Sequence, residues 1–599
     1  MSPINLKDLF SKKPYLSLYF QGSKSDSNPY LLKEVNGKSE YYVTQNNKNL
    51  ASAVAPLTSS LRMIGERKIR ETDLVIVLGL GNPHLIQELN KKINPNQIIL
   101  FIDSSEEILT CLWDKFLLEA MDIPGRHLFL GERLLHLLWG YIESLPIERL
   151  SGIRFFRNSP SIQLNPSFYS EIEERINKLF SSKMSDLLTK FEFERIWVRN
   201  SISNLLNYDS QVTPRFKIKD YLGKYENIPA ILVSAGPSLR SQCTFLKENR
   251  DKVFLLSCDT ALKVLLKFGI IPDGVMTLDA QLHSYFHFLG EDLSEIPIFS
   301  DFVTAPSLLR NFKFKSIIHS LTAKFQVDAS GKPFREITAG GDIVEQYLGA
   351  IGEVQSGGSV ATSAFDILRQ MGFSPIYLTG QDLAYTGREI HSTGTHHNEK
   401  WLTLLSRKKS LEKINEEIVR KRETRYIKAC DNGNVLSDYV LGIYKHWFEE
   451  SANTTDTEII NISDRGSFIE NIKNIKLSEA NELFSSYNNH HYPWRDLAPW
   501  NNSINDTKPS EENLKANFLT EIEKFNQYIE EKSSINSENL LDEIKNKINE
   551  IPYLRQMLRK TEIYLRRHEK DLDESRQREI LINSIKKEIR FLKKGILLA

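Results

Sequence analysis

The chain has 599 residues, of which 77 are Lys or Arg and 77 are Asp or Glu, so its formal net charge is zero. A balanced charge excludes a global electrostatic attraction, and we expect neither nucleic acid nor acidic lipid as a partner. The N-terminus lacks the apolar core of a secretory signal, and no apolar run is long enough to cross a bilayer. We therefore expect a cytoplasmic protein without a membrane span. The length predicts two to four domains.

The first recognisable unit is a Rossmann-like module, which we place within residues 1–200. A buried strand is predicted over residues 73–80, with Gly79 and Gly81 in the turn that leads to a helix. A second strand ends at Asp103, about where a dinucleotide fold places an acidic residue on the ribose. His84 stands where the third glycine of that fingerprint belongs. A module without a cofactor is therefore favoured over a working dinucleotide site.

Two further regions have helical patterns. Residues 146–225 are predicted to be a largely helical linker, since apolar residues recur at Ile172, Ile176 and Leu179. Residues 501–599 are predicted to form a C-terminal helical domain, which begins with a polar linker over residues 501–513. Its expected core positions follow i, i+3 and i+4 spacing. The first such stripe consists of Leu514, Phe518, Ile522, Phe525 and Ile529.

The central domain is predicted over residues 201–400, with an extension over residues 401–500. Residues 229–239, 254–281 and 357–383 each contain a short apolar strand, a small or polar turn and a helix. Repetition of this order predicts an α/β domain with a parallel sheet. In such a sheet the turns gather at the carboxyl ends of the strands, where ligands bind. The fold class is therefore α/β, with a Rossmann-like N-terminal module, a central parallel sheet and a C-terminal helical bundle.

The first three strand ends carry candidate ligand-binding residues. In the turn over residues 234–238, Gly236, Pro237 and Ser238 precede a helix whose unpaired N–H groups favour an anion such as phosphate. The next two strand ends carry the polar residues Asp259, Thr260, Asp279 and Gln281. Polar residues at successive strand ends favour a bound polar ligand over packing alone. A purely structural N-cap role for Asp259 is the alternative.

The fourth strand end combines a glycine turn with possible acid–base residues. Gly358 and Ser359 begin a helix, and the strand that follows this helix ends near Gln381 and Asp382. Tyr385 and His391 lie a few residues further along the chain, and His396 and His397 come shortly afterwards. A neutral histidine beside a site accepts a proton from an attacking hydroxyl near pH 7. The spacing of the histidines does not predict a zinc site.

Several of these segments resemble the motility-associated factor (Maf) family of flagellin glycosyltransferases. The resemblance is carried by SAGPSL, GIIPDGVMTLD, GGSVATSAFDILRQMG and PIYLTGQDLAYTG, the last followed by His391. SKSDSNPYLL, LSDYVLGIYKHWFE and INISDRGSFIENI resemble flanking motifs of the family, so the likeness extends to about residue 476. The central domain is also similar to bacterial sialyltransferases. It departs from them at Ala235 and near Asp259, where those enzymes have asparagines.

The resemblance implies transfer of a nonulosonic, sialic-acid-like sugar from a CMP donor to Ser or Thr of flagellin. It implies no metal and no cofactor beyond the activated sugar. Gly236–Ser238 and Ser359 would contact the phosphate or the donor, and Tyr385 would lie near the leaving group. His391 is the candidate general base, with His396 and His397 as alternatives. The residues expected to line the nucleotide and sugar are Asp259, Thr260, Asp279 and Gln281.

Two alternatives come from other functional classes. Archaeal-type 6-hydroxymethylpterin diphosphokinases resemble the AGPSL and GIIPDG segments and would require ATP and magnesium. The long flanking domains argue against them, because a small-molecule kinase has no need of a protein-binding bundle. The other alternative is a flagellin-binding protein with a vestigial site.

Overall fold

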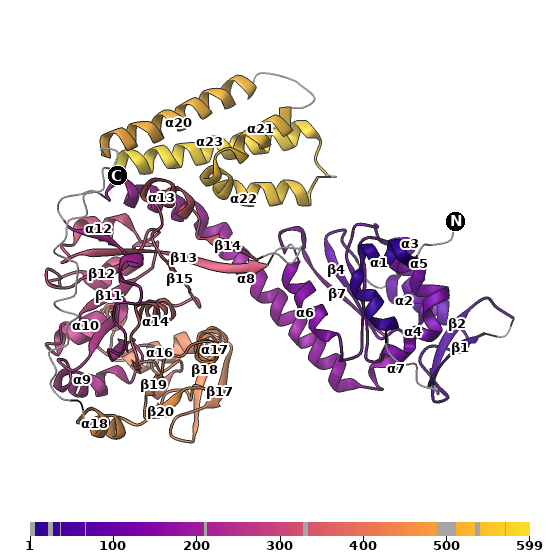
Figure 1. The fold of residues 1–599 in the computed structure, drawn as a ribbon, viewed down its shortest axis with the longest axis horizontal. Coiled ribbons are helices and arrows are strands. Elements are labelled where there is room, and N and C mark those ends of the chain that lie inside the picture. The colour runs from indigo at the N-terminus through magenta and orange to yellow at the C-terminus, as the bar shows by residue number, and fades with distance from the viewer. Residues whose placement is uncertain are drawn as a thin grey trace. The chain divides into compact units, whose positions relative to one another are not determined.

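The computed structural model describes residues 6–21, 28–35, 37–65, 68–145, 147–208, 213–327, 333–485, 487, 511–533, 540–569 and 571–599. The chain divides into two units (Figure 1). Unit 1 comprises Met1–Phe191, Val327–Phe334 and Glu562–Asp573, and unit 2 comprises the rest. Most of the predicted polar linker and residues 23–27 of the SKSDSNPYLL motif lie outside the described residues. The finer division of the chain at residues 200, 400 and 500 stays a prediction.

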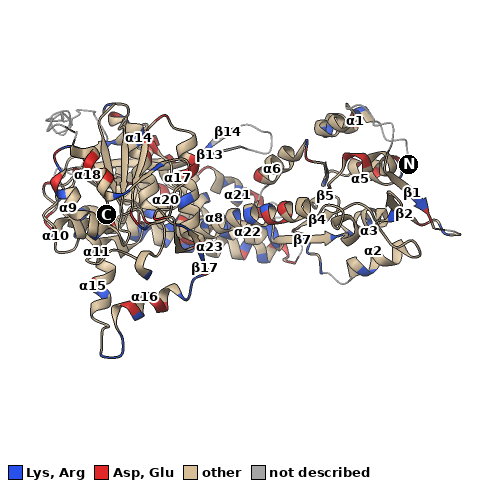
Figure 2. Ribbon diagram, turned by 90° about the horizontal axis from the view of Figure 1, so that it is seen from below, with Lys and Arg blue, Asp and Glu red and all other residues tan. Residues whose placement is uncertain are grey.

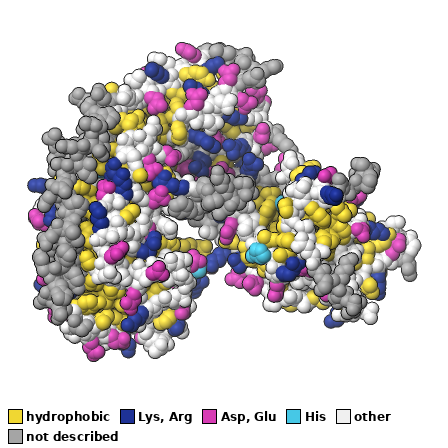
Figure 3. All heavy atoms as spheres, in the orientation of Figure 1, with side chains coloured by type: hydrophobic (Ala, Val, Ile, Leu, Met, Phe, Trp, Pro, Cys, Tyr) yellow, Lys and Arg dark blue, Asp and Glu magenta, His cyan; other side chains and the backbone are white. Residues whose placement is uncertain are grey.

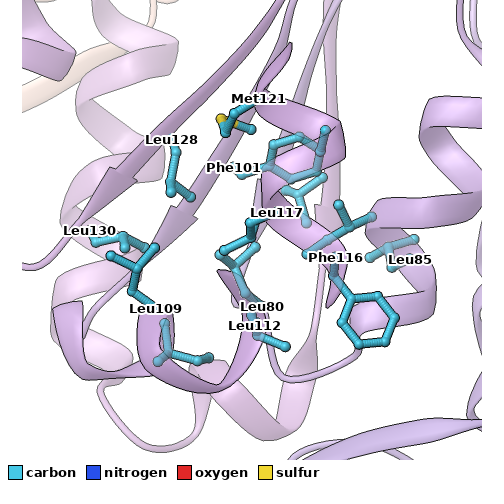
Figure 4. Close-up of a cluster of buried hydrophobic side chains, with 14 of the residues drawn as sticks. Leu80, Leu85, Phe101, Leu109, Leu112, Phe116, Leu117, Met121, Leu128 and Leu130 are labelled. Carbon is cyan, nitrogen blue, oxygen red and sulfur yellow. The ribbon is translucent and has the colours of Figure 1, made fainter. Parts of the chain in front are cut away.

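Unit 1 contains a four-stranded parallel sheet with the order β6-β5-β4-β7. Its strands are β4 (Asp73–Leu78), β5 (Ile99–Asp103), β6 (Arg126–Leu130) and β7 (Gly152–Arg157). Alternate residues of β4 enter the two separate cores on the two faces of the sheet, because successive side chains of a strand point in opposite directions. Figure 4 shows part of one core, where leucines and phenylalanines of β5, β6 and the following helices meet.

The helices of unit 1 cover both faces of this sheet, and a small antiparallel sheet precedes them. The small sheet has strands β1 (Tyr30–Glu34), β2 (Tyr41–Gln45) and β3 (Lys48–Asn49). The main helices are α1 (Leu6–Lys12), α2 (Pro56–Gly65), α3 (Pro83–Lys92), α4 (Leu109–Leu112), α5 (Leu118–Asp122), α6 (Leu135–Ser144), α7 (Ser159–Ile162) and the first part of α8 (Pro166–Leu206), whose residues from Glu192 onward belong to unit 2. The prediction of a helical linker over residues 146–225 missed two strands, the partly buried edge strand β7, which carries two arginines, and the three-residue strand β8 (Arg215–Lys217). Helix α8, with 41 residues, accounts for much of the rest of that stretch.

Unit 2 is built on a large sheet whose described strands follow the order β14-β13-β12-β11-β10-β9-β16-β19-β20, with β8 and β15 paired to β13. The pairings from β13 to β20 along this path are parallel. The strands are β8 (Arg215–Lys217), β9 (Ala230–Val233), β10 (Phe254–Cys258), β11 (Gly274–Thr277), β12 (Ile298–Asp301), β13 (Ile317–Val327), β14 (Pro333–Ile337), β15 (Glu353–Val354), β16 (Ile376–Thr379), β19 (Ile459–Ile462) and β20 (Lys473–Ile475).

Helices cover both faces of the large sheet, which explains why its strands read as continuous apolar runs. On β9, Ala230 and Leu232 enter the core beneath α14 and α17, whereas Ile231 and Val233 enter the core beneath α9, α10 and α18. The helices of the two faces are α9 (Leu239–Glu248), α10 (Asp259–Lys267), α14 (Val360–Met371), α17 (Tyr439–Asn453) and α18 (Leu477–Ser485). The smaller helices are α11 (Tyr285–Phe288), α12 (Pro306–Asn311) and α13 (Gly341–Leu348).

Between β16 and α17 the chain leaves the sheet. It forms two short helices and then an antiparallel hairpin. These elements are α15 (His396–Leu402), α16 (Leu411–Val419), β17 (Thr424–Lys428) and β18 (Asn434–Asp438). In the charged run over residues 406–425, α16 buries Ile414 and Val419 and leaves most of its charged side chains in solvent.

The C-terminal helices are α20 (Glu511–Ser533), α21 (Leu540–Asn549), α22 (Pro552–Arg567) and α23 (Glu574–Leu598). The five residues of the first predicted stripe are all buried. Helices α20 and α21 both contact α23 (Figure 1). Within unit 2 these helices reach α8 through two ion pairs, Arg559–Glu194 at 2.9 Å and Arg195–Glu588 at 3.2 Å. The parallel sheets and C-terminal helices confirm the predicted fold class.

The surface of the protein mixes both signs of charge. Figure 3 shows Lys and Arg side chains interspersed with Asp and Glu on the visible face, as the zero net charge predicts. Within the described residues, no helix is both long and apolar enough to cross a membrane.

Candidate active site

The topology of the large sheet selects one place for a ligand. Strand β9 has β10 on one side and β16 on the other, and the strand order reverses between β9 and β16. Loops that leave two such strands go to opposite faces of the sheet and open a crevice at the strands' carboxyl ends. At this point the loop over residues 234–238 lies beside the loop over residues 380–386. Both loops were predicted to carry site residues.

The two loops approach each other so closely that both need a glycine. The N–H of Gly236 donates to the carbonyl of Gly380 at 2.8 Å. A Cβ on Gly236 would lie 2.2 Å from Oδ2 of Asp382 and 2.3 Å from the oxygen of Gly380. A Cβ on Gly380, whose φ is +61°, would lie 2.1 Å from the carbonyl oxygen of Ser234. The glycines of both motifs therefore serve contact between the loops.

The carboxylate of Asp382 occupies the beginning of helix α9. Its Oδ2 accepts hydrogen bonds from the N–H of Ser238 at 3.0 Å and from the hydroxyl of Ser238 at 2.7 Å. Its Oδ1 accepts from the hydroxyl of Thr386 at 2.7 Å. Burial raises the pKa of Asp382, and these hydrogen bonds oppose that rise. The N–H group expected to hold a phosphate thus already faces an internal anion, and Pro237 has no N–H to offer.

The polar residues after β10 also bond within the chain. Asp259 is buried at the first position of α10. Its Oδ1 accepts from the N–H of Thr260 at 2.6 Å, and its Oδ2 accepts from the hydroxyl of Thr277 at 2.8 Å. The buried Gln381 side chain accepts a hydrogen bond from the hydroxyl of Ser234. Asp259 and Gln381 therefore hold the carboxyl ends of the strands together.

The turn after β11 leaves its polar groups more accessible. Asp279 and Gln281 are both half-buried, and Oδ1 of Asp279 accepts from the N–H of Gln281 at 2.8 Å. Burial is the main cause that raises the pKa of Asp279, and the nearby carboxylate of Asp259 raises it further. Of the predicted polar residues after β10 and β11, Thr260, Asp279 and Gln281 are half-buried, whereas Asp259 is buried.

Four histidines gather beside this edge of the sheet. The ring centroids of His391 and His397 are 5.1 Å apart, in a stacked arrangement. The His287 ring lies 5.4 Å from that of His397 and 5.9 Å from that of His396. Sequence reasoning missed His287, which is buried on α11 with Nε2 3.5 Å from the hydroxyl of Thr260.

The backbone holds the loop of His391 against β9. The N–H of Ser392 donates to the carbonyl of Ala235 at 2.9 Å. The buried Asn398 amide donates to the carbonyls of His391 at 3.1 Å and of Ser392 at 2.7 Å. These bonds fix the direction in which His391 leaves the loop.

His391, His396 and His397 are held in their neutral form. Burial lowers the pKa of His391 to about 4, and His397, His287 and Arg422 lower it further. Burial likewise lowers the pKa of His397 to about 4 and lowers that of His396. A free imidazole titrates near pH 6.5, so this environment disfavours the charged form. At pH 7 the ring of His391 is therefore neutral, and its lowered pKa makes it a weaker base than a free imidazole.

Tyr385 belongs to a network that the sequence did not reveal. Its hydroxyl donates to Oδ2 of Asp438 at 2.5 Å, and Nη1 of Arg422 donates to the same oxygen at 2.9 Å. Asp438 also caps α17 by accepting from the N–H of Leu441 at 2.8 Å. Tyr385 is buried, whereas 43% of the Arg422 side chain is exposed. Arg422 thus brings a cation to the vicinity of His391.

The turn at Gly358 and Ser359 has a local structural explanation. The Ser359 side chain caps α14 by accepting from the N–H of Thr362 at 3.3 Å. Gly358 has a φ of +97°, and a Cβ there would lie 3.1 Å from the ring of Tyr444 on α17. The turn therefore caps α14 and packs against α17, and its contact with the donor stays a prediction.

The glycine turn of unit 1 is filled by its own chain. A Cβ on Gly79 would lie 2.5 Å from Cβ of Ser161, and one on Gly81 would lie 2.3 Å from Cβ of Leu50. Asp103 is buried, and its Oδ2 accepts from the N–H of Leu80 at 2.7 Å. These contacts occupy the groups that a dinucleotide would need, in accord with the interpretation of a module without cofactor.

A second cavity lies at the opposite edge of the large sheet. A cavity of about 390 Å³ lies at the amino ends of the strands of unit 2, lined by Arg250, Ile271 and Asp273 among others. Arg250 is paired with Asp273 there at 2.8 Å, far from the loops that carry the candidate site. In the part of the chain that the structure describes, no group of three or more His, Cys, Asp or Glu side chains is arranged to hold a metal ion.

Comparison with solved structures identifies a protein with this fold. The structure of the Maf glycosyltransferase from Magnetospirillum magneticum AMB-1 aligns with 99% of this chain and 95% of its own, with a TM-score of 0.55 and 15% sequence identity. The chain has the fold of a Maf glycosyltransferase. The model of the family described as 6-hydroxymethylpterin diphosphokinase MptE-like matches residues 203–388, which include the loops at the strand ends but stop short of His391.

Curated relatives come from one organism. An uncharacterized protein of Treponema pallidum (strain Nichols) is 23% identical over 383 residues, which cover 61% of this chain. A second uncharacterized protein of that organism is 32% identical over 123 residues, which cover 20% of this chain. The matches span 61% and 56% of the length of these two relatives.

Proposed function

We propose that the chain is a glycosyltransferase that moves a nonulosonic sugar from a CMP donor to Ser or Thr of flagellin. The observation that carries the proposal is the fold match to a Maf glycosyltransferase over 99% of this chain, which includes the flanking regions as well as the sheet. The resemblance of PIYLTGQDLAYTG and His391 to the Maf motifs supports the choice of a CMP-activated sugar as the donor and of flagellin as the acceptor.

The proposed reaction needs one base and a polarised leaving group. The acceptor hydroxyl oxygen attacks the anomeric carbon, and a new C–O bond forms. The bond from that carbon to the phosphate oxygen of CMP breaks, and CMP leaves with the electron pair. The hydroxyl proton passes to the ring of His391, which is neutral at pH 7 because its pKa is lowered to about 4. The donor already carries its leaving group, so the protein supplies orientation and charge stabilisation.

The exposure of each side chain suggests which residues of the site would contact the ligand. Asp279 and Gln281 are half-buried and would contact the nucleotide or sugar. Arg422 is the partly exposed cation near His391 and would stabilise the charge on the departing phosphate. Asp259, Asp382 and Tyr385 would act by holding the loops in place, since each has its polar atoms bonded within the chain.

The first experiment separates this proposal from the diphosphokinase. The family match to residues 203–388 favours that second candidate, which would use ATP and magnesium. Thermal unfolding would be measured with CMP, with CTP and with ATP, each with and without Mg²⁺. We expect CMP and CTP to raise the melting temperature without added metal. Stabilisation by ATP that depends wholly on Mg²⁺ would favour the diphosphokinase, and no stabilisation by any nucleotide would favour a vestigial site.

The second experiment tests His391 directly. In His391→Ala we expect nearly unchanged CMP affinity and a roughly 10²–10⁴-fold loss of sugar transfer, the usual effect of removing a positioned base. His446→Ala, an exposed histidine on α17, is the matched control and should transfer normally. Transfer by His391→Ala near the wild-type rate would contradict the assignment, and His397 and His396 would then be substituted in the same way.

A further inference from the structure

An arm of two helices extends from the histidine cluster. Helix α15 begins at His396 beside the cluster, and α16 returns toward the sheet (Figure 2). The turn between them is closed by two hydrogen bonds between the backbones of Ser406 and Lys409, at 3.0 and 3.1 Å. Figure 2 shows the arm, residues 396–419, standing out from the body of unit 2 with Lys and Arg at its tip.

The tip of the arm presents leucines to solvent. The exposed fractions are 53% for Leu402, 53% for Leu404 and 41% for Leu405. Burial of apolar surface is favourable by about 25 cal/mol per Å², so three adjacent leucines on a projecting element are costly for the chain alone. Below them, Phe286 is 38% exposed and stacks on His396 with ring centroids 5.1 Å apart. Apolar contacts therefore continue from α11 to the start of the arm.

The charge of the tip has one sign. Residues 400–410 include Lys400, Arg407, Lys408 and Lys409 and no acidic residue. Of these, Lys409 pairs with Glu417 of α16 at 3.2 Å. Leucines surrounded by cations match a partner that presents apolar side chains flanked by carboxylates. This local charge differs from the rest of the protein, whose charges balance.

We propose that the tip of the arm is a docking surface for an acidic amphipathic helix of the acceptor protein. The inference rests on the proposed transfer to a protein hydroxyl. Helix α15 has seven residues, with His396 at its first position and Leu402 at its last, and at about 1.5 Å per residue these two positions are roughly 9 Å apart along the helix. A helix bound at the tip therefore holds neighbouring Ser or Thr residues of its own chain within reach of His391, and raises their effective concentration there.

The test uses the full chain and a synthetic peptide. The probe is a fluorescent helical peptide with leucines along one face and glutamates on both sides of them. Binding is measured by anisotropy at low and at physiological salt. The wild-type protein should bind this peptide more weakly as salt rises, and should bind a lysine-flanked version at least tenfold less tightly.

Two variants of the tip and two matched controls separate apolar from charged contributions. The double substitutions L404S/L405S and R407E/K408E should each weaken peptide binding at least tenfold. The controls are Leu188→Ser, which changes a 57% exposed leucine of α8, and Lys92→Glu, at the exposed end of α3. Both controls should bind the peptide like the wild type. CMP should stabilise all five proteins equally, since the substitutions lie outside the nucleotide loops.

Three results would overturn the docking proposal. The first is wild-type peptide binding that neither tip variant weakens. The second is preferred binding of the tip to vesicles of anionic phospholipid, and the third is self-association in sedimentation that L404S/L405S abolishes. Stabilisation by CMP reports separately on the proposed transferase activity. If the protein binds CMP but not the acidic peptide, the result supports the proposed function and contradicts the docking proposal.

Discussion

Replacing His391 by Asn is expected to reduce the loss of stability of unit 2 in acid. The pKa of His391 is about 4 in the folded protein and about 6.5 in an unfolded chain. Below pH 6.5 the unfolded chain therefore binds a proton that the folded protein does not bind. Stability falls as the pH drops from 6.5 toward 4, and it is fully retained above 6.5.

The size of the effect follows from the two pKa values. A difference between about 6.5 and about 4 is worth ~3.4 kcal/mol once the pH is below both values. At pH 5 the contribution of His391 is about 2 kcal/mol, because the folded ring is still almost entirely neutral there. The groups that face His391 and set its pKa are His397, His287, Arg422 and the backbone of Ala235. Asparagine does not titrate, so His391→Asn removes this contribution and leaves the others.

The assay is urea unfolding of the full chain at pH 7 and pH 5. We expect the free energy of unfolding of the wild type to drop by about 2 kcal/mol more than that of His391→Asn between the two values. His446→Asn, whose ring is 55% exposed on α17, should behave like the wild type. An equal drop for the wild type and His391→Asn would refute the reasoning, since it would mean that His391 takes up its proton equally in both states.

Three other substitutions test the architecture around the site. Gly236→Ala places a Cβ against two oxygens and should destabilise unit 2 by about 1–3 kcal/mol in urea unfolding. Its control is Gly140→Ala, whose Cβ would meet nothing within 4 Å and which should not destabilise the protein. Arg559→Ala leaves the buried Glu194 carboxylate without its ion pair and should cost about 3–5 kcal/mol, whereas a loss below about 1 kcal/mol would show that this pair does not hold the C-terminal helices. Tyr385→Phe removes a donor to a buried carboxylate, so we expect a loss of about 1–3 kcal/mol by thermal or urea unfolding, and unchanged stability would contradict the network.

The repeated order of strand, turn and helix was predictable because helices cover both faces of the large sheet. Each strand must then be apolar at every position, and the turn at its end must be small or polar. This is why β9, β10 and β16 stand out in the sequence and why their loops could be predicted to gather at one edge. Strand β7 was missed because this edge strand, GIRFFR, is only partly buried and carries two arginines, so it lacks the continuous apolar run of the other strands.

The roles of the glycines and carboxylates were harder to predict. A glycine in a strand–helix turn suits close approach by a ligand or by the protein itself, and the sequence pattern is the same in both cases. In unit 1 the neighbours of Gly79 and Gly81 are Ser161 and Leu50, and in unit 2 the neighbour of Gly236 is Asp382. Likewise, an aspartate at a strand end looks the same whether it binds a ligand or, like Asp259, bonds its own helix and strand.

By itself the sequence determined the α/β class, the four loops at one edge of the central sheet and the presence of His391 on one of them. These properties depend on local patterns of apolar and polar residues. Only the tertiary structure decided that Asp382 meets Ser238, that His287 joins the cluster of His391, and that Arg422 lies near it. Such contacts join residues far apart in the chain, and they depend on the packing of whole elements, which no local pattern encodes.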